Sequence, residues 1–269
     1  MVHSAEFKKI KVHYSDTGKG RVIVLLHGFL GSHKIWNEYI KKLSKKFRVI
    51  AIDLPGHGET PSIGYYHSME MLAQSVKAVL DNIGVRRYVI VGHSMGGYTA
   101  LAFAELYPEN ISGICLIHST AYADSEEKKK ERERVIKLVK KQHEQFVAEM
   151  INSLFSPESF SKIPEEVEKV KRIAASISKQ SIISSLEGMK ERKSRELILK
   201  FAEYPVLFIV GKKDTIIHYE TIYPQMGLCK YPSVVMMENY GHMGFYESPK
   251  DTIIELELFA TRCFRKQFE

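Results

Sequence analysis

The stretch Gly92-His93-Ser94-Met95-Gly96-Gly97 decides the fold that this sequence of 269 residues predicts. It follows a short apolar run at residues 88–91 and precedes a helix-like segment at residues 98–107. A serine with glycine two positions away on each side, between a strand and a helix, predicts a sharp turn that lifts the serine hydroxyl above the edge of a sheet. The glycines allow the strand and the helix to approach without Cβ clashes.

Other apolar runs resemble the one before this turn, because they lack the polar alternation of a half-exposed strand. They span residues 22–26, 48–52, 114–117, 206–210 and 234–237. Such runs are typical of strands buried on both faces of a parallel sheet. Helical spacing of apolar residues lies between them, most clearly at 69–83 and 251–264. The alternation predicts a doubly wound α/β fold, with residues 7–14 as an antiparallel edge strand.

Residues 121–204 contain no strand-like run, and their apolar residues follow helical spacing. Ser156-Pro157 and Pro164 are typical helix starts, and Asp124 with Glu127 predicts a capping box. We interpret this segment as a helical cap (lid) inserted between two strands, with a solvated helical appendage as the alternative.

The length of the chain agrees with this organisation, because 269 residues are many for one domain and few for two. We expect an α/β core domain formed by residues 1–120 and 205–269. The cap, residues 121–204, leaves the sheet and returns to it, so it is not a second independent domain.

The composition excludes several other classes of protein. The chain is 44% hydrophobic and 26% charged, which is ordinary for a globular protein. Its net charge of +7 is interpreted as a lysine-rich solvated exterior, so we expect no nucleic-acid partner. Cys115, Cys229 and Cys263 form no CxxC pair, which argues against a zinc ribbon or disulfide scaffold. No run of about 18 apolar residues and no signal peptide is found, so we expect no membrane span and a cytoplasmic location.

A serine hydroxyl needs a base to become a nucleophile, and the base needs a carboxylate to orient it. His242 follows the run at 234–237, and Asp214 follows the run at 206–210. We predict that Ser94, Asp214 and His242 act together; Asp124 and Glu238 are the alternatives for the acid. Other histidines of the chain are alternatives for the base: His27, His57, His93, His118 and His218. We interpret His27 and His57 as loop residues and His93 as a packing residue. His118 is able to line a pocket, and His218 is interpreted as the start of a helix.

Attack on an acyl carbon creates an oxyanion, which needs fixed N–H donors. The backbone amides of Met95 and Phe29 are the predicted donors. An apolar substrate pocket is predicted to include Leu30, Trp36, Tyr122 and Met150, with ordinary core packing as the alternative for each. No metal-ligand spacing and no phosphate-binding glycine loop occurs, so we expect no metal and no cofactor.

With these residues in view, the chain resembles the α/β-hydrolase superfamily over about residues 11–264. The motifs that carry the resemblance are His27-Gly28-Phe29, Asp53-Leu-Pro-Gly-His-Gly58, the Ser94 stretch, Asp214, and Gly241-His242 with Glu247-Ser-Pro249 behind it. Among members it is similar to small bacterial serine carboxylesterases with a helical cap. The resemblance implies a mostly parallel eight-stranded sheet with one antiparallel strand, flanked by helices, and a Ser-His-Asp triad without a cofactor.

The functional expectation is a serine hydrolase that cleaves a carboxylic ester or a related acyl bond of a small molecule through an acyl-enzyme. Ser94 replaces the aspartate nucleophile of haloalkane dehalogenases and epoxide hydrolases, which argues against both. Three alternatives remain: a lyase like that of the menaquinone pathway, suggested by residues 27–32; a C–C bond hydrolase acting on an anionic metabolite; and a ligand receptor that retains the triad. Tyr98 occupies the position at which the menaquinone-pathway lyase carries arginine. His93 occupies the position at which C–C bond hydrolases often carry asparagine.

Overall fold

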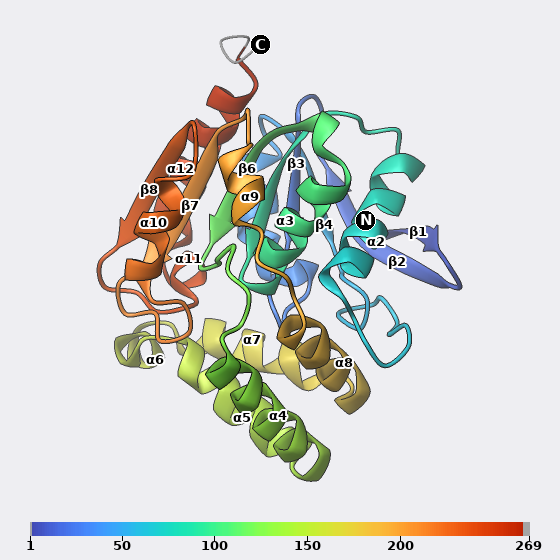
Figure 1. Ribbon diagram of the computed structural model, residues 1–269, viewed down its shortest axis with the longest axis vertical. Coiled ribbons are helices and arrows are strands. Elements are labelled where there is room, and N and C mark those ends of the chain that lie inside the picture. The colour runs from blue at the N-terminus through green and yellow to red at the C-terminus, as the bar shows by residue number, and fades with distance from the viewer. Residues whose placement is uncertain (1, 266–269) are drawn as a thin grey trace.

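An eight-stranded sheet forms the centre of the molecule over residues 2–265, which the computed structural model describes (Figure 1). The strand order is β1-β2-β4-β3-β5-β6-β7-β8. Neighbouring strands are parallel except in the two pairs that β2 makes, with β1 and with β4. The predicted sheet, mostly parallel with one antiparallel strand, is therefore confirmed. The strands are β1 Val2–Phe7, β2 Ile10–Thr17, β3 Val22–Leu26, β4 Arg48–Ile52, β5 Tyr88–His93, β6 Ile111–Ile117, β7 Val206–Gly211 and β8 Pro232–Met237.

Helices cover the sheet, so that β3, β5, β6 and β7 are buried along their whole length. Helices α2 and α3 pack against each other, as do α1 and α12. This burial explains why these strands are continuous apolar runs in the sequence. The α-helices outside the segment between β6 and β7 are α1 Asn37–Leu43, α2 Met69–Asn82, α3 Met95–Leu106, α10 Ile222–Met226, α11 Gly244–Glu247 and α12 Pro249–Cys263.

The N-terminal segment differs from its prediction as a single edge strand. A turn at Lys8 and Lys9 divides it into the antiparallel hairpin of β1 and β2. Lys8 has a φ of 52°, a left-handed conformation that is uncommon for a residue with a side chain. Two adjacent polar residues, Lys8 and Lys9, interrupt the alternation between Phe7 and Ile10, and this interruption marks where the chain reverses.

Six helices connect β6 to β7, and no strand is described between them. They are α4 Glu126–Lys141, α5 His143–Leu154, α6 Pro157–Lys162, α7 Pro164–Ala175, α8 Lys179–Lys190 and α9 Glu196–Lys200. Helices α4 to α8 lie together beyond one end of the sheet (Figure 1). The helix starts predicted at Pro157 and Pro164 are confirmed, whereas the division into a core domain and a cap stays a prediction.

The first of these helices is capped by a different residue from the one predicted. Ser125 is the N-cap, and its hydroxyl accepts a hydrogen bond of 3.2 Å from the Lys128 amide. Asp124 instead accepts hydrogen bonds from the guanidinium groups of Arg132 and Arg192. The long-range partner Arg192 could not be read from local spacing.

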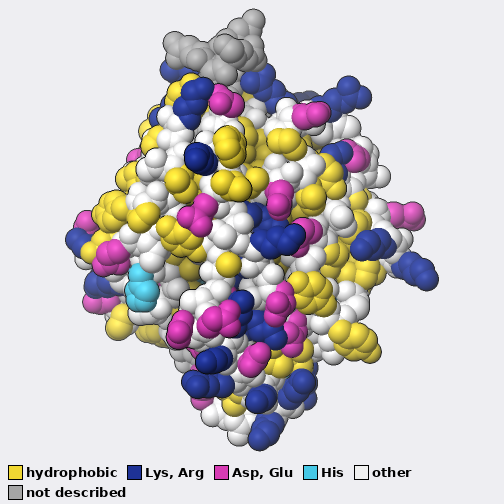
Figure 2. Space-filling model, viewed as in Figure 1, with side chains coloured by type: hydrophobic (Ala, Val, Ile, Leu, Met, Phe, Trp, Pro, Cys, Tyr) yellow, Lys and Arg dark blue, Asp and Glu magenta, His cyan; other side chains and the backbone are white. Residues whose placement is uncertain are grey.

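Charges of both signs mix over the surface of this helical segment (Figure 2). On α4, Lys128 pairs with Glu131 and Lys129 pairs with Glu126. Exposed pairs of this kind stabilise a protein little, so they chiefly keep the helix face hydrated. None of the helices within residues 2–265 is both long enough and apolar enough to cross a bilayer.

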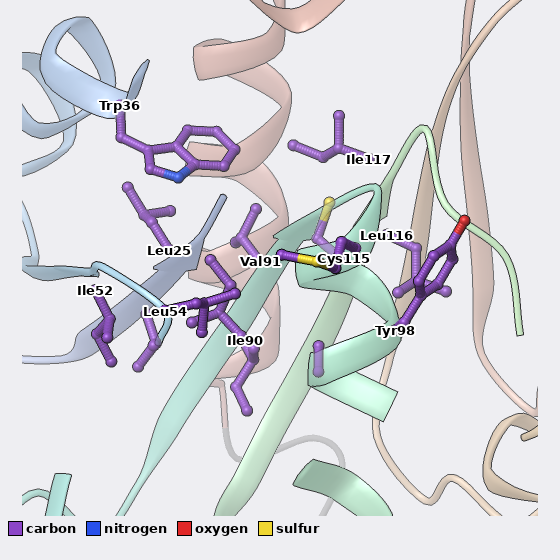
Figure 3. Close-up of a cluster of buried hydrophobic side chains, with 14 of the residues drawn as sticks. Leu25, Trp36, Ile52, Leu54, Ile90, Val91, Tyr98, Cys115, Leu116 and Ile117 are labelled. Carbon is purple, nitrogen blue, oxygen red and sulfur yellow. The ribbon is translucent and has the colours of Figure 1, made fainter. Parts of the chain in front are cut away.

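The buried core contains side chains from β3, β5 and β6, including Leu25, Ile90 and Leu116 (Figure 3). Ile90 lies on β5 directly between Val24 and Ile114 of the neighbouring strands and is inaccessible to solvent. The strand that leads to Ser94 is thus held by packing on both sides.

We predict that Ile90→Ala lowers the free energy of unfolding by about 2–5 kcal/mol, because it removes buried methyl groups and leaves a cavity. Ile254→Ala is the matched control, since Ile254 on α12 is 49% exposed and its loss should change stability by no more than about 0.5 kcal/mol. Urea unfolding followed by circular dichroism measures both. Equal losses in the two variants would contradict the assigned core.

Candidate active site

Ser94 occupies the sharp turn between β5 and α3 with φ 50° and ψ −116°. Its amide donates a 2.9 Å hydrogen bond to the Ile117 carbonyl of β6. The turn brings backbone so close that a Cβ on Gly92 would overlap the Gly96 carbonyl group, and one on Gly96 would overlap the Leu26 carbonyl. Glycine is therefore required at both positions, as the sequence predicted from steric reasoning. Backbone strain that the surrounding structure holds in place, such as the positive φ of Ser94, is common at functional sites.

The structure brings the three predicted residues together at the carboxyl ends of β5, β7 and β8. The Ser94 hydroxyl lies 2.9 Å from His242 Nε2. On the other side of the ring, His242 Nδ1 donates to Asp214 Oδ2 over 2.8 Å. All three residues are buried. A hydroxyl, an imidazole and a carboxylate in this series can move a proton from the serine to the histidine.

Asp214 is an ionised carboxylate surrounded by N–H donors. Its Oδ1 accepts from the amides of Ile216 at 2.8 Å and Ile217 at 3.0 Å. Its Oδ2 accepts from His242 and from His118 Nδ1, the latter at 3.1 Å. Burial acts to raise the pKa of Asp214, but the favourable charges and hydrogen bonds of His242 and His118 outweigh it and hold the pKa well below its usual value.

His118 is the residue of the site whose role was missed in the sequence. It directly follows β6, and its buried ring donates to Asp214. Burial lowers the pKa of His118, and the hydrogen bond to Asp214 opposes this shift in part. The signal that could have found it is its position after the run 114–117, since Ser94, Asp214 and His242 occupy equivalent positions after other strands.

Within the described residues, His118, Asp214 and His242 also form a group whose possible metal-ligand atoms lie within 4.8 Å of one another. Spacing along the chain did not predict this group, because its members come from three different loops. Their polar atoms already bond to each other through Asp214 Oδ2. The arrangement is thus explained by hydrogen bonding to a carboxylate.

Two other histidines lie where the sequence reasoning placed them, in packing and loop support. His93 Nε2 donates a 3.0 Å hydrogen bond to the His242 carbonyl, and its ring packs on Phe245 with a centroid distance of 4.4 Å. His27 Nδ1 donates to the Gly28 carbonyl, while its Nε2 accepts from the Leu54 amide at 3.0 Å.

The loop that carries Phe29 runs beside the serine. A Cβ on Gly28 would lie only 3.1 Å from the Ser94 Cβ. Met95 begins α3, so its amide belongs to the turn of the helix where N–H groups lack intrahelical acceptors. Within residues 2–265, neither the Phe29 amide nor the Met95 amide donates to a backbone acceptor. Their role as oxyanion donors stays a prediction.

The four predicted pocket residues are divided between two environments. Leu30 and Trp36 are fully buried in the core, in which Figure 3 shows Trp36. The Trp36 ring packs against Tyr39 and Phe245. Tyr122 and Met150 are half-buried in the segment between β6 and β7. Leu30 and Trp36 therefore have the environment of ordinary core residues, which was the alternative for each. A role in the substrate pocket stays a prediction for all four residues.

The eight-stranded sheet and the group of Ser94, Asp214 and His242 define a class of protein, and comparison with known families identifies that class. Residues 21–249 match the family described as alpha/beta hydrolase fold, and the chain belongs to this family. Among solved structures, a thermophilic esterase from Thermogutta terrifontis (malate bound) superposes with a TM-score of 0.92 and 28% identity, over 98% of this chain and 100% of that chain.

Curated proteins match over shorter stretches. A 2-hydroxy-6-oxononadienedioate/2-hydroxy-6-oxononatrienedioate hydrolase from Paraburkholderia phymatum is 39% identical over 115 residues, or 40% of each chain. The dihydrolipoyllysine-residue acetyltransferase component of an acetoin cleaving system from Pseudomonas putida is 28% identical over 239 residues, 83% of this chain and 59% of that protein. The matches thus span 40% to 59% of these curated relatives.

We predict that Asp214→Asn lowers the free energy of unfolding at pH 7 by about 2 kcal/mol, because N–H groups lose a charged acceptor. The pKa of Asp214 is lower in the folded than in the unfolded protein. Its contribution is therefore complete above about pH 5 and declines as the pH falls below about 4.

Urea unfolding of both proteins between pH 7 and pH 3 measures this difference. Asp81→Asn is the control, because the Asp81 side chain is 59% exposed and its replacement should cost no more than about 0.5 kcal/mol. A gap between wild type and Asp214→Asn that stays constant down to pH 3 would contradict the assignment of a buried ionised Asp214.

Proposed function

We propose that the protein is a serine hydrolase that cleaves a carboxylic ester of a small molecule through an acyl-enzyme. The observation that carries this proposal is the hydrogen-bonded series from Ser94 Oγ to His242 Nε2, 2.9 Å, and from His242 Nδ1 to Asp214 Oδ2, 2.8 Å. Membership in the family and the similarity to an esterase structure support it.

In the first step, His242 Nε2 accepts the Ser94 proton while Ser94 Oγ attacks the acyl carbon. His242 becomes a cation, which the Asp214 carboxylate stabilises, and Asp214 also keeps the proton on Nδ1 so that Nε2 is free to act as the base. The low pKa of Asp214 means that the carboxylate remains ionised throughout and does not take the proton itself.

The tetrahedral intermediate places negative charge on the former carbonyl oxygen, and the Phe29 and Met95 amides donate to it. His242 then returns the proton to the leaving alcohol, which leaves the acyl group on Ser94. His242 then deprotonates a water molecule that attacks the acyl-enzyme, and it returns this proton to Ser94 Oγ as the bond to the acyl group breaks and the acid leaves. All of these roles are filled by residues of the chain, so the proposal needs no metal or cofactor.

We further propose that residues 121–204 act as a cap that helps hold the histidine loop. The Met243 amide donates to the Leu154 carbonyl at 3.2 Å, directly beside His242. Ser156 Oγ donates to Glu247 at 2.8 Å. These bonds connect the α5–α6 junction to the histidine loop and to α11. Movement of the cap would therefore shift the position of His242.

We predict that Ser94→Ala reduces kcat for a p-nitrophenyl ester by about 10⁶-fold, because it removes the nucleophile of the series. Ser153→Ala is the matched control, since Ser153 is an exposed serine on α5, and it should retain wild-type kcat. Covalent labelling by a fluorophosphonate checks the same atom: wild type and Ser153→Ala should be labelled, and Ser94→Ala should not. Full esterase activity in Ser94→Ala would sink the proposal, and labelling without turnover of any acyl substrate would favour a receptor.

A second candidate is a C–C bond hydrolase acting on an anionic metabolite. It is favoured by the 39% identity over 115 residues to a 2-hydroxy-6-oxononadienedioate/2-hydroxy-6-oxononatrienedioate hydrolase. The same serine, histidine and aspartate would serve. We expect kcat/KM to be higher for simple esters than for vinylogous 1,5-diketone acids, measured by product analysis. The reverse order would replace the ester proposal by this one.

A further inference from the structure

His118 has an unusual backbone and a fixed position. It follows β6 with a φ of 46°, and its amide donates a 2.8 Å hydrogen bond to the Ile209 carbonyl of β7. Within residues 2–265, the non-glycine residues with positive φ are Lys8, Leu30, Ser94 and His118. Apart from Lys8 in the hairpin turn, they lie around the proposed site. Strained backbone that the surrounding structure holds in place is a reason to look for function.

The His118 ring is enclosed by backbone that leaves it little freedom. A Cβ on Gly211 would lie 2.9 Å from His118 Cε1, and a Cβ on Gly244 would lie 3.0 Å from His118 Nε2. Its Nδ1 lies 3.1 Å from Asp214 Oδ2. Its Nε2 is buried and has no hydrogen-bond partner in the described part of the chain. The ring is therefore held with one nitrogen directed at the carboxylate that orients the proposed base.

We infer that His118 is a positioning residue of the proposed triad: its Nδ1–H shares Asp214 Oδ2 with His242, fixes the carboxylate, and sets the pH at which His242 becomes an effective base. This inference rests on the proposed hydrolase function. It gives a role in the reaction to His118, a histidine that contacts neither Ser94 nor the reacting atoms. The proposed route to the reaction is Asp214 Oδ2; the His118 ring also lies 5.7 Å from the His242 ring, measured between centroids, and both variants below remove that ring alike.

The direction of the effect follows from the sharing of one oxygen. Two N–H groups on Oδ2 divide its negative charge, so each receives a weaker acceptor than it would alone. If the His118 donor is removed, more charge is available to His242, and its cation becomes more stable relative to the neutral ring. The neutral ring is the base, so the acid limb of the pH profile moves to higher pH.

Other titratable groups face the same three side chains. His93 of β5 lies 6.1 Å from the His118 ring and 5.1 Å from the His242 ring, measured between centroids. Burial, with the neighbouring histidines His242 and His118, lowers the pKa of His93. Glu247 of α11 acts on His118 electrostatically. Because His93 and Glu247 stay unchanged in the variants below, a shift between those variants reports the His118 donor.

The test compares His118→Asn with His118→Leu in the pH dependence of kcat/KM for a p-nitrophenyl ester. Asparagine tolerates the left-handed backbone, and its side-chain N–H₂ can replace the Nδ1–H donor. Leucine offers no donor. We expect the midpoint of the acid limb to rise by about half a pH unit or more in His118→Leu, and the kcat of this variant to fall about tenfold. In His118→Asn, the midpoint of the acid limb should stay within about 0.2 pH units of the wild-type value. KM should change less than about twofold in both variants, because His118 does not contact substrate in this scheme.

An unchanged midpoint in His118→Leu, or an equal shift in both variants, would overturn the inference. A merely structural role would lower activity at every pH without moving the midpoint. If His118→Leu does not fold, histidine ¹⁵N NMR of the wild-type protein decides, with the His118 signals assigned by their loss in His118→Asn. Protonation at Nδ1 with bare Nε2 supports the inference, and the opposite tautomer overturns it. Absence of esterase activity in the wild-type protein would instead count against the proposed function and leave the tautomer result standing.

Discussion

The turn at Ser94 is the constraint on which the site depends. A φ of 50° in a residue with a side chain persists only where the surrounding structure holds it. That support comes from β6 and its following loop, since the Ser94 amide donates to Ile117 and its carbonyl accepts from Ser119 Oγ at 2.8 Å. The close packing of strand and helix at Gly92 and Gly96 leaves the hydroxyl directed at His242.

The buried carboxylate of Asp214 is the second requirement, and it is linked to the first through His242. A charge removed from water is costly unless N–H groups replace its hydration. The N–H groups that replace water around Asp214 come from the amides of Ile216 and Ile217 after β7, from His242 after β8 and from His118 after β6. The site is therefore assembled by the edge of the sheet as a whole, and the helical segment between β6 and β7 contacts it at Met243 and Glu247.

The sequence predicted Ser94, Asp214 and His242 as a group because each lies in the loop that follows a continuous apolar run, and parallel strands end at one edge of a sheet. Predictions failed where a local pattern had two solutions. Alternation resumes after Lys8 and Lys9, so residues 7–14 suit either one interrupted strand or part of a hairpin. Asp124 has the spacing of a cap but binds Arg192, 68 positions further along the chain. Such choices depend on partners that no short window contains.

By itself, the sequence determined the glycine-flanked turn and the order of strands and helices after the N-terminal hairpin, because hydrophobic spacing and steric freedom are properties of neighbouring residues. It also placed a serine, a carboxylate and a histidine after strands that must be buried. Only the tertiary structure decided that His118 shares the Asp214 carboxylate and that Trp36 packs in the core. Both depend on which strands become neighbours in the sheet and which loops meet beyond its edge, and these are distances in space that spacing along the chain does not specify.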